Sequence, residues 1–548
     1  MERRSFLKAL SPSVPTTKTL TPPTAGFEPY AGPWSETEAA HLLRRTTYGP
    51  NHQQIKDAVS LGLDGTINLL TEDLPLPPPP VNYDFDGDPD VPLGATWVDA
   101  PYNIINNTNG YRRRSIYAWV NGRLLTGEMN IREKMVMFWH NHFVVADLND
   151  ARFYYRYMSL FRSKPLPDFR QLTKDITIDP AMLRYLNGNQ NSKAAPNENY
   201  ARELLELFTI GKGPLVGPGD YTNYTEDDVV QIAKVLTGWR DSGYTSTIQP
   251  TIGSSFFLNR HDTTTKKLSP RFGSVTISNQ SENEYKVLID IIFQQKEVAR
   301  FICRKLYRWF LFYKIDETVE AEIIEPMAQL LVDNNYNMKP VVIAFLKSAH
   351  FNEASMSGCM IKNPLDFLSK LVNQFKLDMP TALDQQYRLW LNMANYCTSL
   401  QMRPFFHPNV AGWAAFYQEP SFYQIWLNAV TLPLRQQLTD SICSPNAILA
   451  NIRVDVNPIA FIETLNNPLD INVILQDLNI LLLSKPFTES QIEILKEIAL
   501  PGLPDYEWTL EYQMYKDNPT NNDLRRAIET KIRNLLTYIM RMPEFQLS

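Results

Sequence analysis

The segment Asn197–Gly211, NENYARELLELFTIG, combines several carboxylates with one arginine in a pattern that could do acid–base chemistry. Asn197 is a good N-cap and Gly211 suits the position after a last turn, so the spacing predicts a helix between them. Its apolar side chains fall on one face, and the polar side chains fall on the other: Glu198, Asn199, Arg202, Glu203 and Glu206. The functional interpretation makes Glu198 or Glu203 a general acid/base and Arg202 a clamp for an anionic group. A solvent-exposed face with i,i+4 ion pairs explains the same pattern.

Two histidines, His140 and His142, form an H-x-H motif that suggests metal binding. They follow a helical pattern, and side chains two residues apart in a helix point about 200° apart, so we expect the rings on opposite sides. The alternatives for His140 are a buried, hydrogen-bonded ring or, together with His41, a proton carrier or ligand in a catalytic site. No cluster has metal-ligand spacing and the four cysteines form no CxxC pair, so we expect no bound metal and no cofactor.

A further set of residues has types suited to substrate binding: Arg45, Trp139, Asn199, Trp239, His261, Asp262 and Trp413. His261 and Asp262 lie in an irregular segment, where a loop histidine can act as a base or ligand; a surface turn is the alternative. Trp413 ends a Pro/aromatic loop whose rings could line a pocket or fill the core. We expect the residues with catalytic potential to converge with Arg45 in one cleft: His41, Arg45, His140, Glu198, Arg202 and Glu203.

The composition indicates an ordinary globular protein. The chain has 548 residues, with 53 Lys and Arg against 59 Asp and Glu, so no general basic field for nucleic acid exists. Glycine is scarce and hydrophobic residues make up 44%, which favours packed helices joined by proline-containing connections. No apolar run approaches the roughly 18 residues that span a bilayer. Common nucleotide, serine-hydrolase and zinc-protease motifs do not occur.

Local signals predict a mainly α-helical protein with a large, irregular helical body. Ser35 and Glu38 form a capping box at the first clear helix, and Thr225 with Asp228 resembles another. Residues 74–101 are rich in proline and predict a long loop. Residues 241–285 are rich in Ser, Thr, Gly and β-branched types and predict a small β-containing insertion. We expect one large domain over 34–548, preceded by an extended arm over 1–33.

The first residues resemble a twin-arginine export signal. Arg3, Arg4 and Phe6-Leu7-Lys8 match its core, but the apolar stretch that must follow is interrupted by prolines. Burying such a stretch in a membrane would leave backbone groups unpaired. We therefore predict that the segment is not cleaved as a conventional signal and lies along the helical body, ordered mainly from about Tyr30.

Five motifs together carry a family resemblance: HLLRRTTYG from His41, FWHNHF from Phe138, the NENYARELLELFTIG block, YTEDDV followed by LTGW, and PNVAGW ending at Trp413. With these motifs the chain is identified as a member of the bacterial domain-of-unknown-function family 1800 (DUF1800), from about residue 35 to the C-terminus. The resemblance implies no established reaction. It implies that members often carry twin-arginine signals and often neighbour a sulfatase/phosphatase-like family, domain-of-unknown-function family 1501 (DUF1501).

Two functions follow as hypotheses. The first is a hydrolase or lyase that acts on an extracellular polymer, such as a glycan, through an acidic/Arg/His cleft. The second is a non-enzymatic accessory or binding protein that works with a DUF1501 partner. Localisation stays open. The twin-arginine signals that members of the family often carry favour an exported or periplasmic protein, whereas the missing apolar stretch favours the cytoplasm. We expect neither a nucleic-acid partner nor a transmembrane segment.

Overall fold

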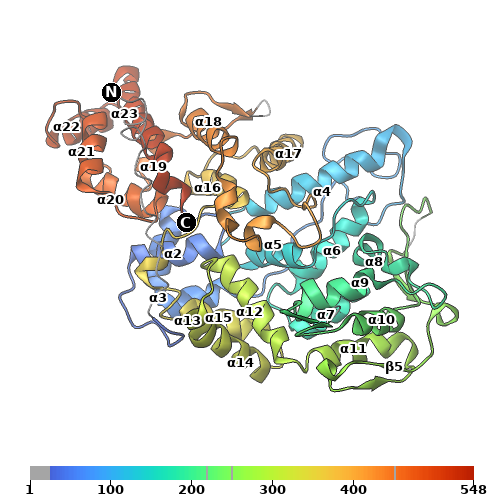
Figure 1. Cartoon of the computed structure of the whole chain (residues 1–548). Coiled ribbons are helices and arrows are strands. Elements are labelled where there is room, and N and C mark those ends of the chain that lie inside the picture. The colour runs from blue at the N-terminus through green and yellow to red at the C-terminus, as the bar shows by residue number, and fades with distance from the viewer. Residues whose placement is uncertain (1–24, 218–219, 249–250, 450–451) are drawn as a thin grey trace, which may run out of the picture.

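Helices dominate the computed structural model, which describes residues 25–217, 220–248, 251–449 and 452–548 (Figure 1). The first half contains α2 (Glu36–Thr46), α3 (His52–Leu70), α4 (Thr108–Leu124), α5 (Arg132–His142), α6 (Ala151–Ser163), α7 (Phe169–Thr177), α8 (Pro180–Tyr185), α9 (Glu198–Glu203), α10 (Glu226–Val235), α11 (Glu284–Ile292) and α12 (Lys296–Phe310). The second half contains α13 (Glu317–Val319), α14 (Glu325–Asp333), α15 (Met338–Lys347), α16 (Pro364–Gln374), α17 (Leu383–Ser399), α18 (Thr431–Cys443), α19 (Pro458–Ile462), α20 (Ile471–Leu482), α21 (Glu489–Ala499), α22 (Tyr506–Asp517) and α23 (Asn522–Arg541). The predicted mainly α-helical fold is confirmed.

The strands form small antiparallel pairs rather than a sheet that could organise the molecule. They are β1 (Leu215–Gly217) with β2 (Asp220–Tyr221), β3 (Trp239–Ser242) with β4 (Gly253–Phe256), β5 (Lys266–Lys267) with β6 (Thr276–Ile277), and β7 (Ile448–Leu449) with β8 (Ile452–Arg453). The predicted β-containing insertion at 241–285 holds the second half of β3 and all of β4 to β6. The pairs β1–β2 and β7–β8 lie outside it.

Helix starts follow the capping signals in the sequence. Ser35 caps α2 in a complete capping box with Glu38, and Thr225 does the same for α10 with Asp228. Asn197 caps α9, as predicted. The predicted single helix that follows Asn197 changes type, however, because α9 ends at Glu203 and residues Leu204–Thr209 form a π-helix. A π-helical segment shifts the hydrogen-bond partners of the backbone and is frequent at functional sites.

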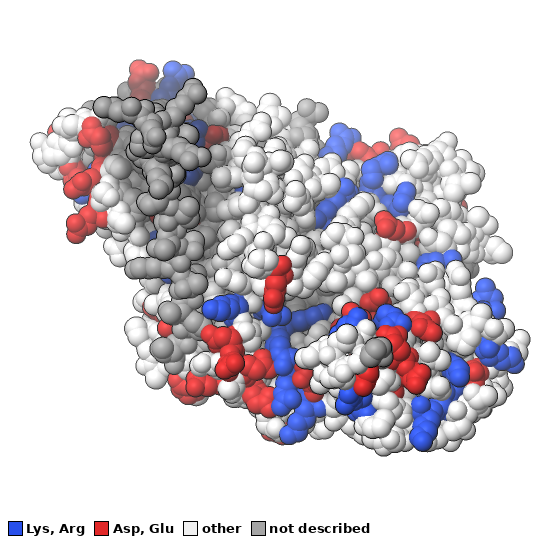
Figure 2. Space-filling view, in the orientation of Figure 1, with Lys and Arg blue, Asp and Glu red and all other residues white. Residues whose placement is uncertain are grey.

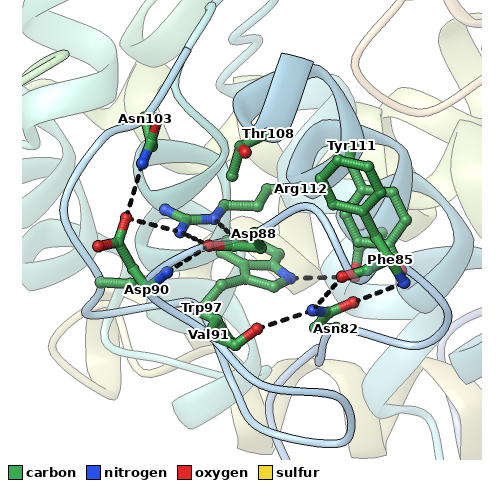
Figure 3. Close-up of polar contacts among 12 residues, drawn as sticks. Asn82, Phe85, Asp88, Asp90, Val91, Trp97, Asn103, Thr108, Tyr111 and Arg112 are labelled. Carbon is green, nitrogen blue, oxygen red and sulfur yellow. Dashed lines mark hydrogen bonds and ion pairs between the residues drawn. The ribbon is translucent and has the colours of Figure 1, made fainter. Parts of the chain in front are cut away.

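The predicted long loop at 74–101 is held by buried polar contacts (Figure 3). Arg112 on α4 donates from Nε and Nη2 to the two carboxylate oxygens of Asp88, each at 2.8 Å, and both side chains are buried. Asn82 donates from Nδ2 to the carbonyl oxygens of Phe85 and Val91 at 2.9 and 2.8 Å. These bonds replace the regular secondary structure that the prolines exclude.

The described part of the N-terminal segment lies extended against the turn after α15. Tyr30 N–H donates to Lys347 O at 2.8 Å, Ala349 N–H to Glu28 O at 2.8 Å, and His350 N–H to Gly26 O at 3.0 Å. The twin-arginine-like residues and the predicted fate of that segment lie outside the described residues. No helix in the described ranges is both long and apolar enough to cross a membrane.

Buried apolar side chains form one continuous core through the molecule. In Figure 1 the helices α20–α23 lie at one end and α7–α11 at the other, with α2, α5, α12 and α16 between them. The C-terminal half of α2 is fully enclosed, since every residue from Ala39 to Thr46 is buried. The polar side chains in the last turn of α2 therefore lie in the interior of the protein.

Candidate functional site: a buried cationic cavity

The residues predicted to converge in one cleft lie in three different surroundings. Arg202 is part of a surface network on α9 and α10, where it donates to both carboxylate oxygens of Glu226 at 2.8 and 2.7 Å and to Glu198 at 3.3 Å. His140 is fully buried on α5, and His41 is buried on α2. None of the described hydrogen bonds or ion pairs joins Arg202, His140 and His41. The arginine on the polar face of α9 is paired with carboxylates at the surface, whereas the two histidines are buried.

Both histidines hydrogen-bond to groups within the protein. His140 Nε2 accepts from Phe405 N–H at 2.9 Å, so its Nδ1 carries the proton and donates to the Tyr157 hydroxyl at 2.9 Å. His41 Nε2 donates to Phe351 O at 3.0 Å. Burial, with Arg45 next in effect, lowers the pKa of His41 to about 3, and burial lowers the pKa of His140 to about 3. Both rings are neutral at physiological pH, which does not suit a proton carrier.

His142 points away from His140, as the helical spacing predicted. Its Nε2 donates to Phe208 O at 3.1 Å, and its Nδ1 accepts from Lys305 Nζ at 3.1 Å. Lys305 also donates to Leu207 O at 2.8 Å, a carbonyl in the π-helix. No shared metal site for His140 and His142 is formed.

The residues predicted to bind substrate also have partners within the protein. Trp139 is buried and donates from Nε1 to Pro165 O at 2.9 Å, and Asn199 donates to Leu186 O at 3.2 Å. His261 is buried, with Nδ1 2.9 Å from Thr237 O and Nε2 3.1 Å from Glu284. The others have local contacts as well: Asp262 accepts from Thr264 N–H, Trp239 packs against Phe256 and Tyr285, and Trp413 stacks on His407.

Arg45 differs from these residues, because it belongs to a buried cluster of basic side chains. The last turn of α2 places Arg44 and Arg45 in the interior, next to basic side chains from three other segments. The six basic residues are 6% exposed or less: Arg44 and Arg45 on α2, Lys134 on α5, Lys362 before α16, Lys370 on α16 and Arg435 on α18. Among the described side chains one carboxylate, that of Asp366, accompanies them; it accepts from Lys134 Nζ and, at 2.8 Å, from Asn363 Nδ2. Buried charges are normally paired one for one, so this excess of cations requires an explanation.

Several of these side chains line a small cavity. Arg44, Arg45, Lys134, Lys362 and Asp366 form its polar wall, and Ser548 lies against it. Trp309, Phe416 and Trp426 form an aromatic wall, in which the Trp309 and Phe416 ring centroids are 4.7 Å apart. The cavity encloses about 20 Å³, which is room for one water molecule. Lys370 and Arg435 are not among the residues that line the cavity.

The basic groups are only partly satisfied by protein acceptors. Arg45 donates to Met356 O at 2.9 Å and Arg435 to Lys362 O at 2.9 Å, while Lys362 donates to Phe545 O. These acceptors are neutral carbonyls rather than carboxylates. Among the described residues, four buried donors of the cluster have no partner: Nε of Arg44, Nε of Arg45, Nε of Arg435 and Nζ of Lys370. The cluster therefore keeps donors free for an additional acceptor.

Burial and mutual repulsion disfavour the charged forms of the basic side chains in this cluster. Burial lowers the pKa of Lys370 to about 7, of Arg44 to about 10 and of Arg435 to about 9. Burial lowers the pKa of Lys362 well below its usual value, with Lys370 and Arg44 adding to the effect. A negatively charged ligand would reverse these shifts, because an opposite charge favours the protonated base.

Sequence reasoning identified Arg45 but not the cluster around it. Lys134, Lys362, Asp366 and Arg435 are far apart in the chain and have no common spacing. The one available signal was the Arg44–Arg45 pair itself. Two adjacent cations at the end of a helix cannot both face solvent when the apolar residues before them place that helix in the core.

The visible surface has a different character from the cavity. Figure 2 shows Lys and Arg side chains over α12 beside acidic side chains near α9 and α10, so both signs are mixed there. A cation would not be held in the cavity, since its lining is itself cationic.

A separate group of side chains at the opposite end of α2 could hold a metal ion. It consists of Glu36, His52 and Asp477.

Comparison with known proteins gives one match. Residues 41–547 match a protein family described as "Protein of unknown function (DUF1800)". No curated protein and no solved structure matches the chain.

Proposed function

Because the chain belongs to the DUF1800 family, whose function is unknown, we propose a function from the cavity: the protein binds an anionic group of its ligand, a carboxylate, sulfate or phosphate, beside Arg45 and Lys362. The observation that supports this proposal is the excess, among the described side chains, of six buried basic groups over the single carboxylate of Asp366. An uncompensated buried ion destabilises a protein by several kcal/mol. A bound oxyanion would accept from the free arginine donors and would offset that cost.

The small volume of the cavity restricts what can enter. One charged group fits with a modest shift of the lining side chains, whose flexible stems allow it, while the rest of a ligand would remain outside the cavity. Trp309 and Phe416 of the aromatic wall are half-buried, and their accessible parts would contact an apolar or sugar-ring portion that remains outside the cavity. An acidic glycan or its fragments would meet both requirements.

Titration with inorganic sulfate and phosphate tests the proposal. Isothermal titration at constant ionic strength would show a saturable site in the wild-type protein. Arg45→Met and Lys362→Met each remove one charge at nearly constant volume, and each should weaken binding roughly tenfold to a hundredfold, since a charge-assisted hydrogen bond contributes about 1.5–3 kcal/mol. Arg388→Met, which removes an exposed arginine paired with Asp84, is the matched control and should not change affinity. Equal weak binding by all four proteins would contradict the proposal.

A second candidate, a hydrolase or lyase that acts on an extracellular polymer, is supported by Glu203. Burial raises the pKa of the half-buried Glu203 carboxyl, and the neighbouring Glu206 raises it further. A raised carboxyl pKa is what a general acid needs near neutral pH. Polygalacturonate, alginate and a sulfated dextran would serve as probes, with release of reducing ends or unsaturated products as the signal. Glu203→Gln should abolish turnover, whereas Glu282→Gln, at an exposed site, should not.

The accessory function makes the opposite prediction for turnover. A protein that presents an anionic ligand to a DUF1501 partner would bind the same polymers through the cavity without cleaving them. Binding that is lost in Arg45→Met, combined with no turnover by the wild-type protein, would favour this alternative over an enzyme.

A further inference from the structure

Three side chains suited to metal binding meet at the outer end of α2. Glu36 lies in the first turn of α2, His52 begins α3, and Asp477 lies in α20. Their ligand atoms all lie within 4.8 Å of one another. His52 Nε2 is 3.9 Å from Glu36 Oε2 and 3.9 Å from Asp477 Oδ1. Residues distant in sequence thus present one nitrogen and two carboxylates to a common point.

The His52 ring is oriented for a ligand. Its Nδ1 lies 2.9 Å from Thr464 O, and since a carbonyl can only accept, Nδ1 donates; in the neutral ring Nε2 then presents its lone pair. His52 is 1% exposed, and Nε2 has no hydrogen-bond partner in the described part of the chain. An unsatisfied buried acceptor costs about 1–3 kcal/mol. Two carboxylates cannot satisfy a lone pair, but a cation among the three groups can.

Contacts behind the ligands hold them in place. Asp477 is 2% exposed, and its two oxygens accept from Asn466 N–H at 2.7 Å and from Asn466 Nδ2 at 2.9 Å. Together with the carbonyl behind His52, this resembles the outer shell that orients ligands in metal sites. The Glu36 side chain is 26% exposed, so this edge of the group opens to solvent.

We propose that Glu36, His52 and Asp477 bind a divalent transition-metal ion, Zn²⁺ being the best fit. Calcium and magnesium prefer oxygen-only ligands, whereas zinc accepts imidazole nitrogen with carboxylate oxygen. Tetrahedral zinc ligands lie about 3.4 Å apart, so the 3.9 Å separations close by about half an ångström. The accessible Glu36 side chain can close its own separation from His52, a small rotation of the His52 ring or the Asp477 carboxylate would close the other, and solvent supplies the fourth ligand.

The ion would join the N-terminal helices to the C-terminal part of the chain. Helices α2 and α20 are in contact, and Arg44 at the far end of α2 donates to Ile480 O in α20. A metal between Glu36 and Asp477 would therefore fix α2 from its other end. This inference rests on the three ligands alone and does not depend on the proposed anion site.

Zinc titration of the full chain without a histidine tag tests the inference. All seven histidines and all four cysteines are buried, which limits adventitious binding at the surface. After chelator treatment and dialysis, the wild-type protein should bind one equivalent of zinc by calorimetry and elemental analysis. Glu36→Gln and Asp477→Asn should each weaken binding at least roughly a hundredfold. Asp57→Asn, which alters an exposed carboxylate on α3, should bind like the wild type.

A second readout identifies the ligands. Cobalt(II) bound at the site should give visible absorption bands of a low-coordinate complex with nitrogen and oxygen ligands, and these bands should be absent in Glu36→Gln. Glu36 makes no hydrogen bond that the fold requires, so this variant keeps the test valid if Asp477→Asn fails to fold. Equal zinc binding by wild type and Glu36→Gln, or no stoichiometric zinc in the wild type, would overturn the inference.

Discussion

At the scale of single residues, the chemistry of this protein depends on where charges are buried rather than on which motifs they belong to. Arg202 and Arg45 both occur in recognisable blocks, yet Arg202 pairs with Glu226 at the surface and Arg45 reaches only neutral acceptors in the interior. The sequence could predict that both arginines were of interest. It could not predict which one lacked a carboxylate partner, because the partner comes from another helix.

Lys370 should make stability depend on pH. Burial lowers its pKa to about 7 from the usual 10.5, so between these values the unfolded chain binds more protons than the folded protein, and the free energy of unfolding rises with pH. Below about pH 7 both states are protonated and the full penalty applies. Lys370→Met should therefore be more stable than the wild type at pH 6, and the difference should shrink between pH 7 and 10.

Urea unfolding at pH 6, 8 and 10 measures this difference. Lys376→Met, which changes an exposed lysine just after α16, is the control and should leave the profile unchanged. A stability difference for Lys370→Met that stays constant over this pH range would show that Lys370 is not a buried titrating base.

At the scale of elements, sequence signals predict where helices begin better than they predict the type of helix that follows. The capping boxes at Ser35 and Thr225 involve neighbours in sequence, so they could be identified directly. The change from α-helix to π-helix after Glu203 could not, because Lys305 of α12 bonds the Leu207 carbonyl and is close only in the folded chain. The loop at 74–101 was predicted as a loop, but the buried pair that organises it depends on Arg112 of α4.

That buried pair gives a prediction at the same scale. Asp88→Asn leaves the buried Arg112 guanidinium with only its longer ion pair to Asp90, at 3.7 Å, and breaking a buried pair costs about 3–5 kcal/mol. Urea unfolding should show this loss, and proteolysis within 74–101 should become faster. Asp86→Asn changes an exposed acid in the same loop and should have neither effect. Equal stability of the two variants would refute the assigned role of the Arg112–Asp88 pair.

At the scale of the whole molecule, charge is distributed in a way that composition does not show. The formal net charge is -6, yet the interior near α2, α5, α16 and α18 holds six basic side chains with one carboxylate among them. The mainly helical fold could be predicted from the sequence, since periodicity and capping act locally. The cavity could not be, because it brings together residues from Arg44 to Arg435 whose proximity arises only when the helices pack.

The most direct test of the proposed anion site is anomalous diffraction from crystals that contain selenate, an oxyanion of sulfate's size and charge. We expect a selenium peak within hydrogen-bonding distance of Arg45 and Lys362, and no such peak in crystals of Arg45→Met. Selenate found only at exposed surface positions in the wild-type protein would contradict the proposed anion site.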